Sequence, residues 1–220
     1  MRTAFAIAVL LTVACGLGPL LPAMAGVASA TEQQASDIMP ADRFWQLIGR
    51  TIGYQADPER QLKALRQVLR ELTVPEIEAF ERTFHQQQRR AYRWDLWGAA
   101  YIMNGGASDD GFEYFQRWLM SKGRTVFEAA LADPDSLVEM IAPGSQGDYE
   151  FESFAYAAAD IWKEKTGIDP VTDQQRRFPF ISAPPVSEPS GEPFEEDADY
   201  LARRYPRLWA RFGQRAGDAP

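Results

Sequence analysis

The sequence predicts an all-α protein: a single multi-helix domain with a Pro-rich extended strap and a C-terminal helix that docks on the domain. Three observations support this prediction. Apolar residues recur at three- and four-residue spacing along most of the chain, helix-start signals precede these stretches, and alternating strand patterns are scarce. The 220 residues, of which 45% are hydrophobic and 25% charged, are enough for one well-filled core.

The first two helices are predicted from their ends as well as from their apolar stripes. The first covers residues 42–52 and ends at Gly53. Asp57 and Pro58 then supply an N-cap and a proline at the first helical position of the second helix. The apolar faces of the two helices are Phe44, Ile48 and Ile52, and Leu62, Leu65, Leu69 and Leu72.

The third helix starts with a capping box, in which Thr73 caps the helix and Glu76 reaches back to a free N–H group. Its buried face is predicted to be Ile77, Phe80 and Phe84. The polar run at residues 85–90 indicates either a solvated stretch or a bend, so we expect His85 to be exposed. Helical spacing resumes over residues 92–103, and a Gly-Gly pair ends that helix.

Further helices are predicted before the composition changes. Ser108 starts one of them, and a short helix around Phe127 follows. The Asp133-Pro134 pair starts another, and residues 149–165 form the last of this group. Their apolar positions are Phe112, Phe115, Leu119, Leu131, Leu137, Val138, Ile141, Phe151, Phe154, Ala158, Ile161 and Trp162.

The domain organisation follows from the composition. Residues 41–167 form the predicted helical core domain, and the proline-rich residues 168–194 form the strap. Residues 195–213 form a C-terminal helical segment that packs on the core. We expect the strap to be held by Phe178, Phe180 and Ile181, and the C-terminal helix by Leu208, Trp209 and Phe212.

The N-terminus has the pattern of a secretory signal peptide over residues 1–30, followed by a short linker over residues 31–40. An uninterrupted apolar run precedes small residues, so we expect cleavage after Ala25 or Ala30 and a periplasmic or secreted protein. Two alternatives stay open, both of which would hold the chain at a membrane. One is lipidation of Cys15, and the other is an uncleaved apolar anchor.

Charge and the rare residue types exclude several classes of function. Asp and Glu total 31 against 23 Lys and Arg, which argues against nucleic-acid binding because phosphate contacts need a basic surface. The single Cys and the single His exclude Cys-based and multi-His metal sites. No G-x-S-x-G, P-loop or G-x-G-x-x-G motif occurs, so no cofactor is predicted.

Two Trp- and Gly-rich stretches carry a resemblance. The stretch YRWDLWGAAY at residues 92–101, together with GGASDDGFEYF at residues 105–115, resembles the bacterial family called domain of unknown function 4240. The resemblance extends over roughly residues 42–212, including the closing YPRLW at residues 205–209. It implies a shared fold, and it implies no activity, substrate or cofactor.

The carboxylates around residue 109 are the first candidate site. Asp109, Asp110 and Glu113 are of the type that binds Mg²⁺ or Ca²⁺ or does acid–base work. The simpler interpretation is a helix start, in which Ser108 is the cap and two acids lie at the positive end of the helix. We favour the helix start and therefore expect no metal.

The aromatic stretch before this motif is the second candidate. Trp94, Trp97 and Tyr101 lie on one helical face, and an aromatic platform of this kind suits a flat ligand such as a sugar ring. Burial in the core is the interpretation we favour. The other candidate ligand-binding residues are Arg93 and Asn104, and the polar Arg93 and Asp95 need partners if they are buried.

The leading functional hypothesis is a non-enzymatic interaction or binding module, which implies a protein partner and no nucleic acid. The alternative is a carboxylate-dependent hydrolase, metal-assisted or not. It would use Asp95, Asp109, Asp110 and Glu113 as its catalytic acids. The two hypotheses differ in whether these side chains converge on one open pocket.

Overall fold

The computed structural model describes residues 38–142, 148–175, 177–179 and 188–217. The predicted signal peptide, with Cys15 and both cleavage sites, lies outside these residues, as does most of the predicted linker. Phe180 and Ile181 of the strap also lie outside them. All of the described residues belong to the compact unit that begins at Ser36.

The all-α prediction is confirmed, because the regular elements of the described residues are helices and 3-10 turns, and the one extended pairing among them is an isolated bridge. The elements in chain order are α2 (Ala41–Gly49), η1 (Ile52–Tyr54), α3 (Pro58–Arg70), α4 (Val74–Arg90), α5 (Trp94–Asn104), α6 (Asp109–Ser121), α7 (Arg124–Ala132), η2 (Pro134–Met140), η3 (Glu152–Tyr156), α8 (Ala157–Thr166), α9 (Ala198–Arg204) and α10 (Pro206–Gly217). Within the described part of the chain, no helix is long and apolar enough to cross a membrane.

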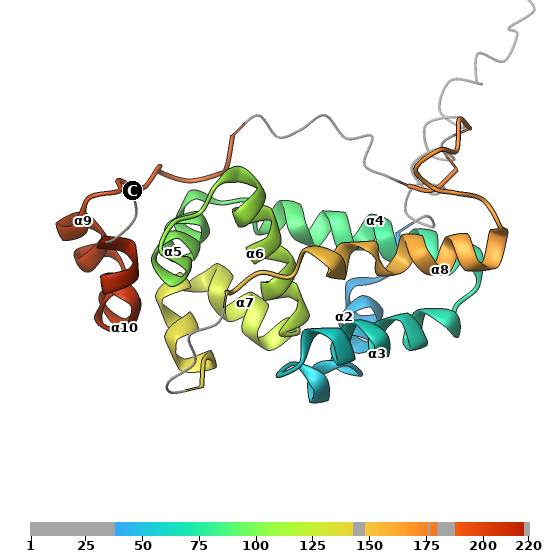
Figure 1. The fold of residues 1–220 in the computed structure, drawn as a ribbon, viewed down its shortest axis with the longest axis horizontal. Coiled ribbons are helices and arrows are strands. Elements are labelled where there is room, and N and C mark those ends of the chain that lie inside the picture. The colour runs from blue at the N-terminus through green and yellow to red at the C-terminus, as the bar shows by residue number, and fades with distance from the viewer. Residues whose placement is uncertain (1–37, 143–147, 176, 180–187, 218–220) are drawn as a thin grey trace, which may run out of the picture. The chain divides into compact units, whose positions relative to one another are not determined.

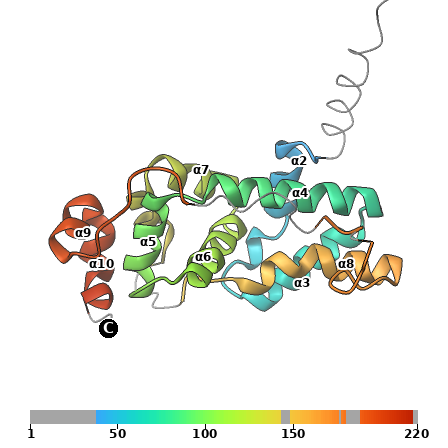
Figure 2. The ribbon, with the colours of Figure 1, turned by 90° about the horizontal axis from the view of Figure 1, so that it is seen from above.

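Helices distant in sequence lie side by side. Helix α8 runs along both α3 and α4 (Figures 1 and 2), and α10 packs along α5 and η2. The core between them is rich in aromatic rings. Phe44 contacts Phe80 at a ring-centroid distance of 4.9 Å, and Phe154 from η3 approaches Phe84. One continuous apolar core therefore joins α2, α4 and η3.

The helix starts predicted from the sequence form as hydrogen-bonded caps. The side chain of Asp57 accepts the N–H of Arg60 at 3.1 Å. The carboxylate of Glu76 accepts both the backbone N–H and the hydroxyl of Thr73 at 2.8 Å, and Arg43 also donates to it. These three interactions lower the pKa of Glu76 to about 2.

Helix α4 continues unbroken through residues 85–90, so the polar run is not a bend, and the expectation that His85 is exposed is wrong. Helix α4 packs against α2, α6 and α8, so few of its faces are left to water. The Gln87 side chain is accordingly buried, and His85 is only 13% exposed, with its Nε2 atom 3.0 Å from the buried carboxylate of Glu81. Polar residue types therefore gave a wrong indication of exposure at helix faces that neighbouring helices cover.

The first helix is shorter than predicted. Helix α2 ends at Gly49, and the chain turns through η1 before α3 begins. The buried hydroxyl of Thr51 donates to the carbonyl of Ile48 at 2.8 Å and accepts from the amide of Gln61 at 3.2 Å. These bonds stabilise the turn, and an apolar stripe cannot reveal them.

The C-terminal helix docks on the domain through a buried carboxylate as well as through apolar side chains. Asp135 accepts the backbone N–H groups of Arg207 and Leu208 at 3.1 and 2.8 Å, near the start of α10. The guanidinium of Arg207 in turn pairs with Asp133, Asp135 and Glu139. Leu208 and Phe212 are buried, and Trp209 is half-buried. Asp135 therefore caps a helix that lies some seventy residues further along the chain.

The strap is held at its first half by one aromatic ring. Phe178 is buried and lies 5.4 Å from the ring of Trp162. The second anchor, at residues 188–197, lies on helix α5 and forms part of the site described next.

Candidate functional site

Helix α5 carries a ladder of stacked aromatic rings. Trp94 stacks on Trp97 at 5.2 Å with planes 16° apart, and Trp97 stacks on Phe112 of α6 at 4.8 Å and 14°. The indole N–H of Trp97 donates to the carbonyl of Ala107 at 2.9 Å. The inner rings of the ladder are therefore held by the core, and its outer member, Trp94, remains half-exposed.

Tyr101 extends this aromatic face by one helical turn, and we call Trp94, Trp97 and Tyr101 the α5 platform. The opposite faces of the helix are buried: Leu96, Ala100 and Met103 are fully covered. Helix α5 thus has the two distinct faces that the sequence predicts. The three rings of the platform are neither fully buried nor fully exposed.

Arg93 and Asp95 pair with each other at the start of the helix. The guanidinium of Arg93 donates to both carboxylate oxygens of Asp95 at 3.0 and 2.6 Å. The side chains are 36% and 17% exposed. Asp95 also accepts the N–H of Leu96 at 2.8 Å. Its carboxylate is therefore engaged in the helix start, and it orders Arg93 beside the platform.

Residues 188–197, which we call the cover segment, lie across the platform. The N–H of Ser190 donates to the carbonyl of Tyr92, and the N–H of Trp94 donates to the carbonyl of Ser190, both at 3.0 Å. The ring of Phe194 approaches Trp94 edge-on at 6.3 Å and Tyr101 at 5.6 Å. Residues far apart in sequence thus meet at one aromatic face.

Acidic groups of the cover segment act on Tyr101 of the platform and on Tyr92 beside it. The hydroxyl of Tyr101 donates to Glu196 at 3.3 Å. Burial, and then the negative charge of Glu196, raise the pKa of Tyr101. Burial, with Asp109 and Glu188 as further causes, also raises the pKa of Tyr92. A neutral, donating hydroxyl is therefore the stable form of Tyr101.

The side chain of Asn104 has a structural partner and does not extend the α5 platform. Its carbonyl oxygen accepts the N–H of Tyr149 at 2.9 Å, which ties the end of α5 to the chain before η3. Its buried Nδ2 atom has no hydrogen-bond partner among the described residues. The amide oxygen thus fixes a loop, and neither N–H of the amide nitrogen is used among the described residues.

Three of the four candidate acids, Asp109, Asp110 and Glu113, lie near one another along α6, whereas Asp95 lies on α5. The hydroxyl of Ser108 accepts the N–H of Gly111 at 3.2 Å, and Asp109 and Asp110 are exposed in the first helical turn. Glu113 pairs with the buried Arg117 one turn later. Across the described ranges, no group of three or more His, Cys, Asp or Glu side chains has the geometry to hold a metal ion.

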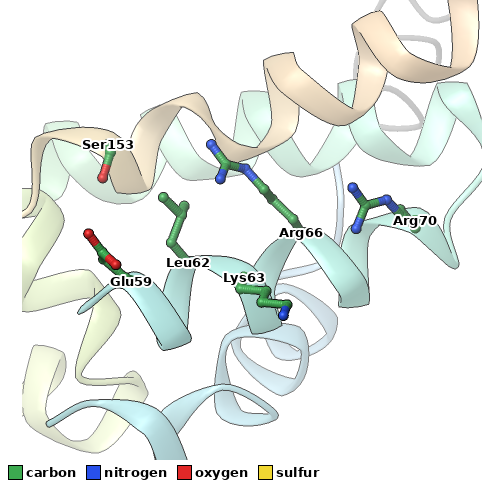
Figure 3. A pocket seen from close by; sticks show the side chains of 6 residues that line it. All are labelled: Glu59, Leu62, Lys63, Arg66, Arg70 and Ser153. Carbon is green, nitrogen blue, oxygen red and sulfur yellow. The ribbon is translucent and has the colours of Figure 1, made fainter. Parts of the chain in front are cut away.

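An open groove lies elsewhere, between α3 and the segment formed by η3 and α8. It has a volume of about 550 Å³ and is lined by Glu59, Leu62, Lys63, Arg66, Arg70 and Ser153. Figure 3 shows Arg66 and Arg70 reaching from α3 toward α8, while Lys63 points away. Arg66 pairs with Asp160, and Arg70 pairs with Glu164. These cations join two helices, so the groove wall has a structural explanation.

Sequence reasoning missed Ser190, Phe194 and Glu196 as components of the site. The signal was present but faint: Phe194 is a lone aromatic residue in a stretch of prolines and acids. Such a residue has no helical stripe to join, so its place in the fold depends on a tertiary contact.

Comparison with known proteins identifies the domain. Residues 39–164 match the model of a family described as a protein of unknown function, DUF4240. No curated protein and no solved structure shows significant similarity to the chain. The matched region runs from two residues before α2 to the last turn of α8 and covers more than half of the sequence, so the chain belongs to the DUF4240 family.

Proposed function

We propose that this protein is a non-enzymatic binding module, exported from a bacterial cell, whose ligand face is the α5 platform. The export part of the proposal rests on the signal-like residues 1–30. The binding part rests on the geometry around helix α5.

The observation that carries the proposal is the stacked ladder under Trp94. Trp97 and Phe112 hold the Trp94 ring in one orientation, and the Trp97 hydrogen bond to Ala107 fixes that orientation further. A ring that is already ordered loses little conformational freedom when it contacts a ligand. The platform is therefore preorganised for recognition of a flat or apolar group.

The contacts of the carboxylates favour binding over hydrolysis. Asp95 is engaged by Arg93 and by the N–H of Leu96, and Glu113 is engaged by Arg117. Asp109 and Asp110 lie at the positive end of α6, where their charge stabilises the helix. A general acid and a general base need to face one reacting group, and the ion pairs of Asp95 and Glu113 engage both of these acids with the protein itself.

The test uses the protein labelled with 5-fluorotryptophan, in which the ¹⁹F signal of Trp94 is assigned from Trp94→Phe. Cellobiose, diacetylchitobiose and short acidic peptides containing Phe are titrated at millimolar concentration. We expect at least one class to shift the Trp94 signal saturably. Tyr101→Ala should weaken that binding at least tenfold, and Asp109→Asn should leave it unchanged. Absence of any shift, or cleavage of a probe that Asp109→Asn abolishes, would overturn the proposal.

A further inference from the structure

We infer that the α5 platform recognises extended peptides in which an aromatic residue is followed two positions later by a carboxylate. The cover segment occupies this site as an internal ligand. The inference rests on the proposed function, because it names the ligand class of the same face.

The cover segment is bound as a peptide ligand would be. Two backbone hydrogen bonds at Ser190 add a single parallel bridge to the chain before α5. Strand addition of this kind recognises the peptide backbone whatever its side chains are. The buried Pro189 and the following Pro193 favour an extended chain that is ready to bind.

Side-chain specificity comes from two points on the platform. The Phe194 ring lies between Trp94 and Tyr101, where an edge-on aromatic contact is favourable. Two residues later, Glu196 accepts the hydrogen bond of the Tyr101 hydroxyl. A ring and a carboxylate at this spacing, on an extended backbone, are therefore the chemistry that the face selects.

Apart from Asp197, whose carboxylate caps α9 by accepting the N–H of Tyr200 at 2.8 Å, the cover segment contributes little to holding the fold around it. Its side chains are exposed, except for Pro189 and the half-buried Phe194. The helices after it have anchors of their own, since Asp135 caps α10 and Leu201 and Tyr205 are buried. Release of residues 188–196, with Asp197 still capping α9, would thus leave α9 and α10 in place and uncover the platform.

Competition between the internal segment and an external peptide has a quantitative consequence. A tethered ligand is present at a high effective concentration, so it lowers the apparent affinity for the same ligand added from outside. Weakening the internal contact should restore that affinity. Wild-type protein is therefore expected to bind an external peptide more weakly than a variant whose cover segment has lost its ring.

The experiment compares wild type with Phe194→Ala, using the ¹⁹F signal of Trp94 and a peptide that copies residues 188–197, EPSGEPFEED. Glu192→Ala is the matched control, because Glu192 lies exposed on the same segment. We expect Phe194→Ala to bind the peptide at least tenfold more tightly than wild type or Glu192→Ala. Replacing the peptide's Phe by Ala should abolish binding, and replacing its penultimate Glu by Gln should weaken it several-fold.

Other results would overturn the inference. Equal affinity of wild type and Phe194→Ala, or equal binding of the peptide without Phe, would show that the ring is not recognised. A Trp94 response to a disaccharide but not to the peptide would reject the inference and leave the proposed function standing. If no probe shifts Trp94, both fail. If Phe194→Ala does not fold, wild type titrated to several millimolar with the Phe and Ala peptides provides the same discrimination.

Discussion

The hydroxyl of Tyr205 donates a hydrogen bond to the backbone carbonyl of Asp95 at 2.9 Å, across an interval of more than a hundred residues. The tyrosine ring lies directly over Gly98 in the middle of α5. A Cβ atom at position 98 would lie 2.9 Å from Cζ of the ring, which is closer than real Cβ contacts. Burial raises the pKa of Tyr205 to about 12, so the phenol keeps its donating proton at physiological pH.

We predict that Gly98→Ala destabilises the protein even though alanine is the better helix former. Overpacking of a filled core costs about 1–3 kcal/mol, against about 1 kcal/mol of gain in helix propensity. Gly49→Ala is the control, because nothing lies within 4 Å of a Cβ at that helix position. Urea denaturation should show a loss for Gly98→Ala and no loss for Gly49→Ala. Equal effects would contradict the close approach of Tyr205.

Asp135→Ala should weaken the docking of the C-terminal helix. The buried carboxylate accepts two N–H groups near the start of α10, so its removal is expected to cost about 1–3 kcal/mol. Glu139→Ala removes an exposed partner of the same Arg207 and should cost less than about 1 kcal/mol. Thermal unfolding of the two variants measures the difference, and similar melting temperatures would show that Asp135 does not cap α10.

The capping box at Thr73 makes the free energy of unfolding depend on pH. The pKa of Glu76 is lowered to about 2 in the folded protein, so its ionised form stabilises the fold above the unfolded-state pKa of about 4.3. This contribution is lost as the pH falls from about 5 to about 2. Because a third of the side chain is exposed, we expect Glu76→Gln to cost only about 0.5–1 kcal/mol at pH 7. The cost should shrink with acidification in urea titrations, and a cost that grows toward pH 3 would contradict the assignment.

Substitutions at the start of α6 distinguish a structural role of its carboxylates from a metal site. Ser108→Ala should cost about 1 kcal/mol as a lost cap, and Asp109→Asn a few tenths as a lost interaction with the helix dipole. Millimolar Mg²⁺, Ca²⁺ or Mn²⁺ should leave the melting temperature unchanged, since an ion that bound only the folded state would raise it. A metal-induced rise that Asp110→Asn abolishes would make the carboxylates a metal site.

Local signals in the sequence were sufficient for the starts of α3, α4 and α6. Asp57, Thr73, Glu76 and Ser108 act within three or four residues of their partners, so their spacing in sequence is their spacing in space. The burial of His85 was not accessible in this way, because it depends on which helices cover α4. Residue type is a poor guide once tertiary packing decides exposure.

The candidate site was half predictable for the same reason. The faces of α5 followed from helical periodicity, which placed Trp94, Trp97 and Tyr101 together. The contribution of Phe194 and the cap from Asp135 are contacts between segments about seventy to one hundred residues apart. No periodicity links such positions, so they appear only when the fold brings them together.

The most direct test of the account is amide hydrogen exchange at the bridge between the cover segment and α5. The amides of Ser190 and Trp94 both form bridge hydrogen bonds, whereas the amide of Ile102 lies inside α5. If the cover segment can leave the platform, the Ser190 and Trp94 amides should be protected from exchange at least tenfold less than the Ile102 amide. The Ser190 and Trp94 amides should also exchange at the same rate as each other. Phe194→Ala should lower the protection of these two amides and leave Ile102 unchanged. If all three amides exchange only with global unfolding, and Phe194→Ala affects them equally, the segment is an integral part of the domain and the account is wrong.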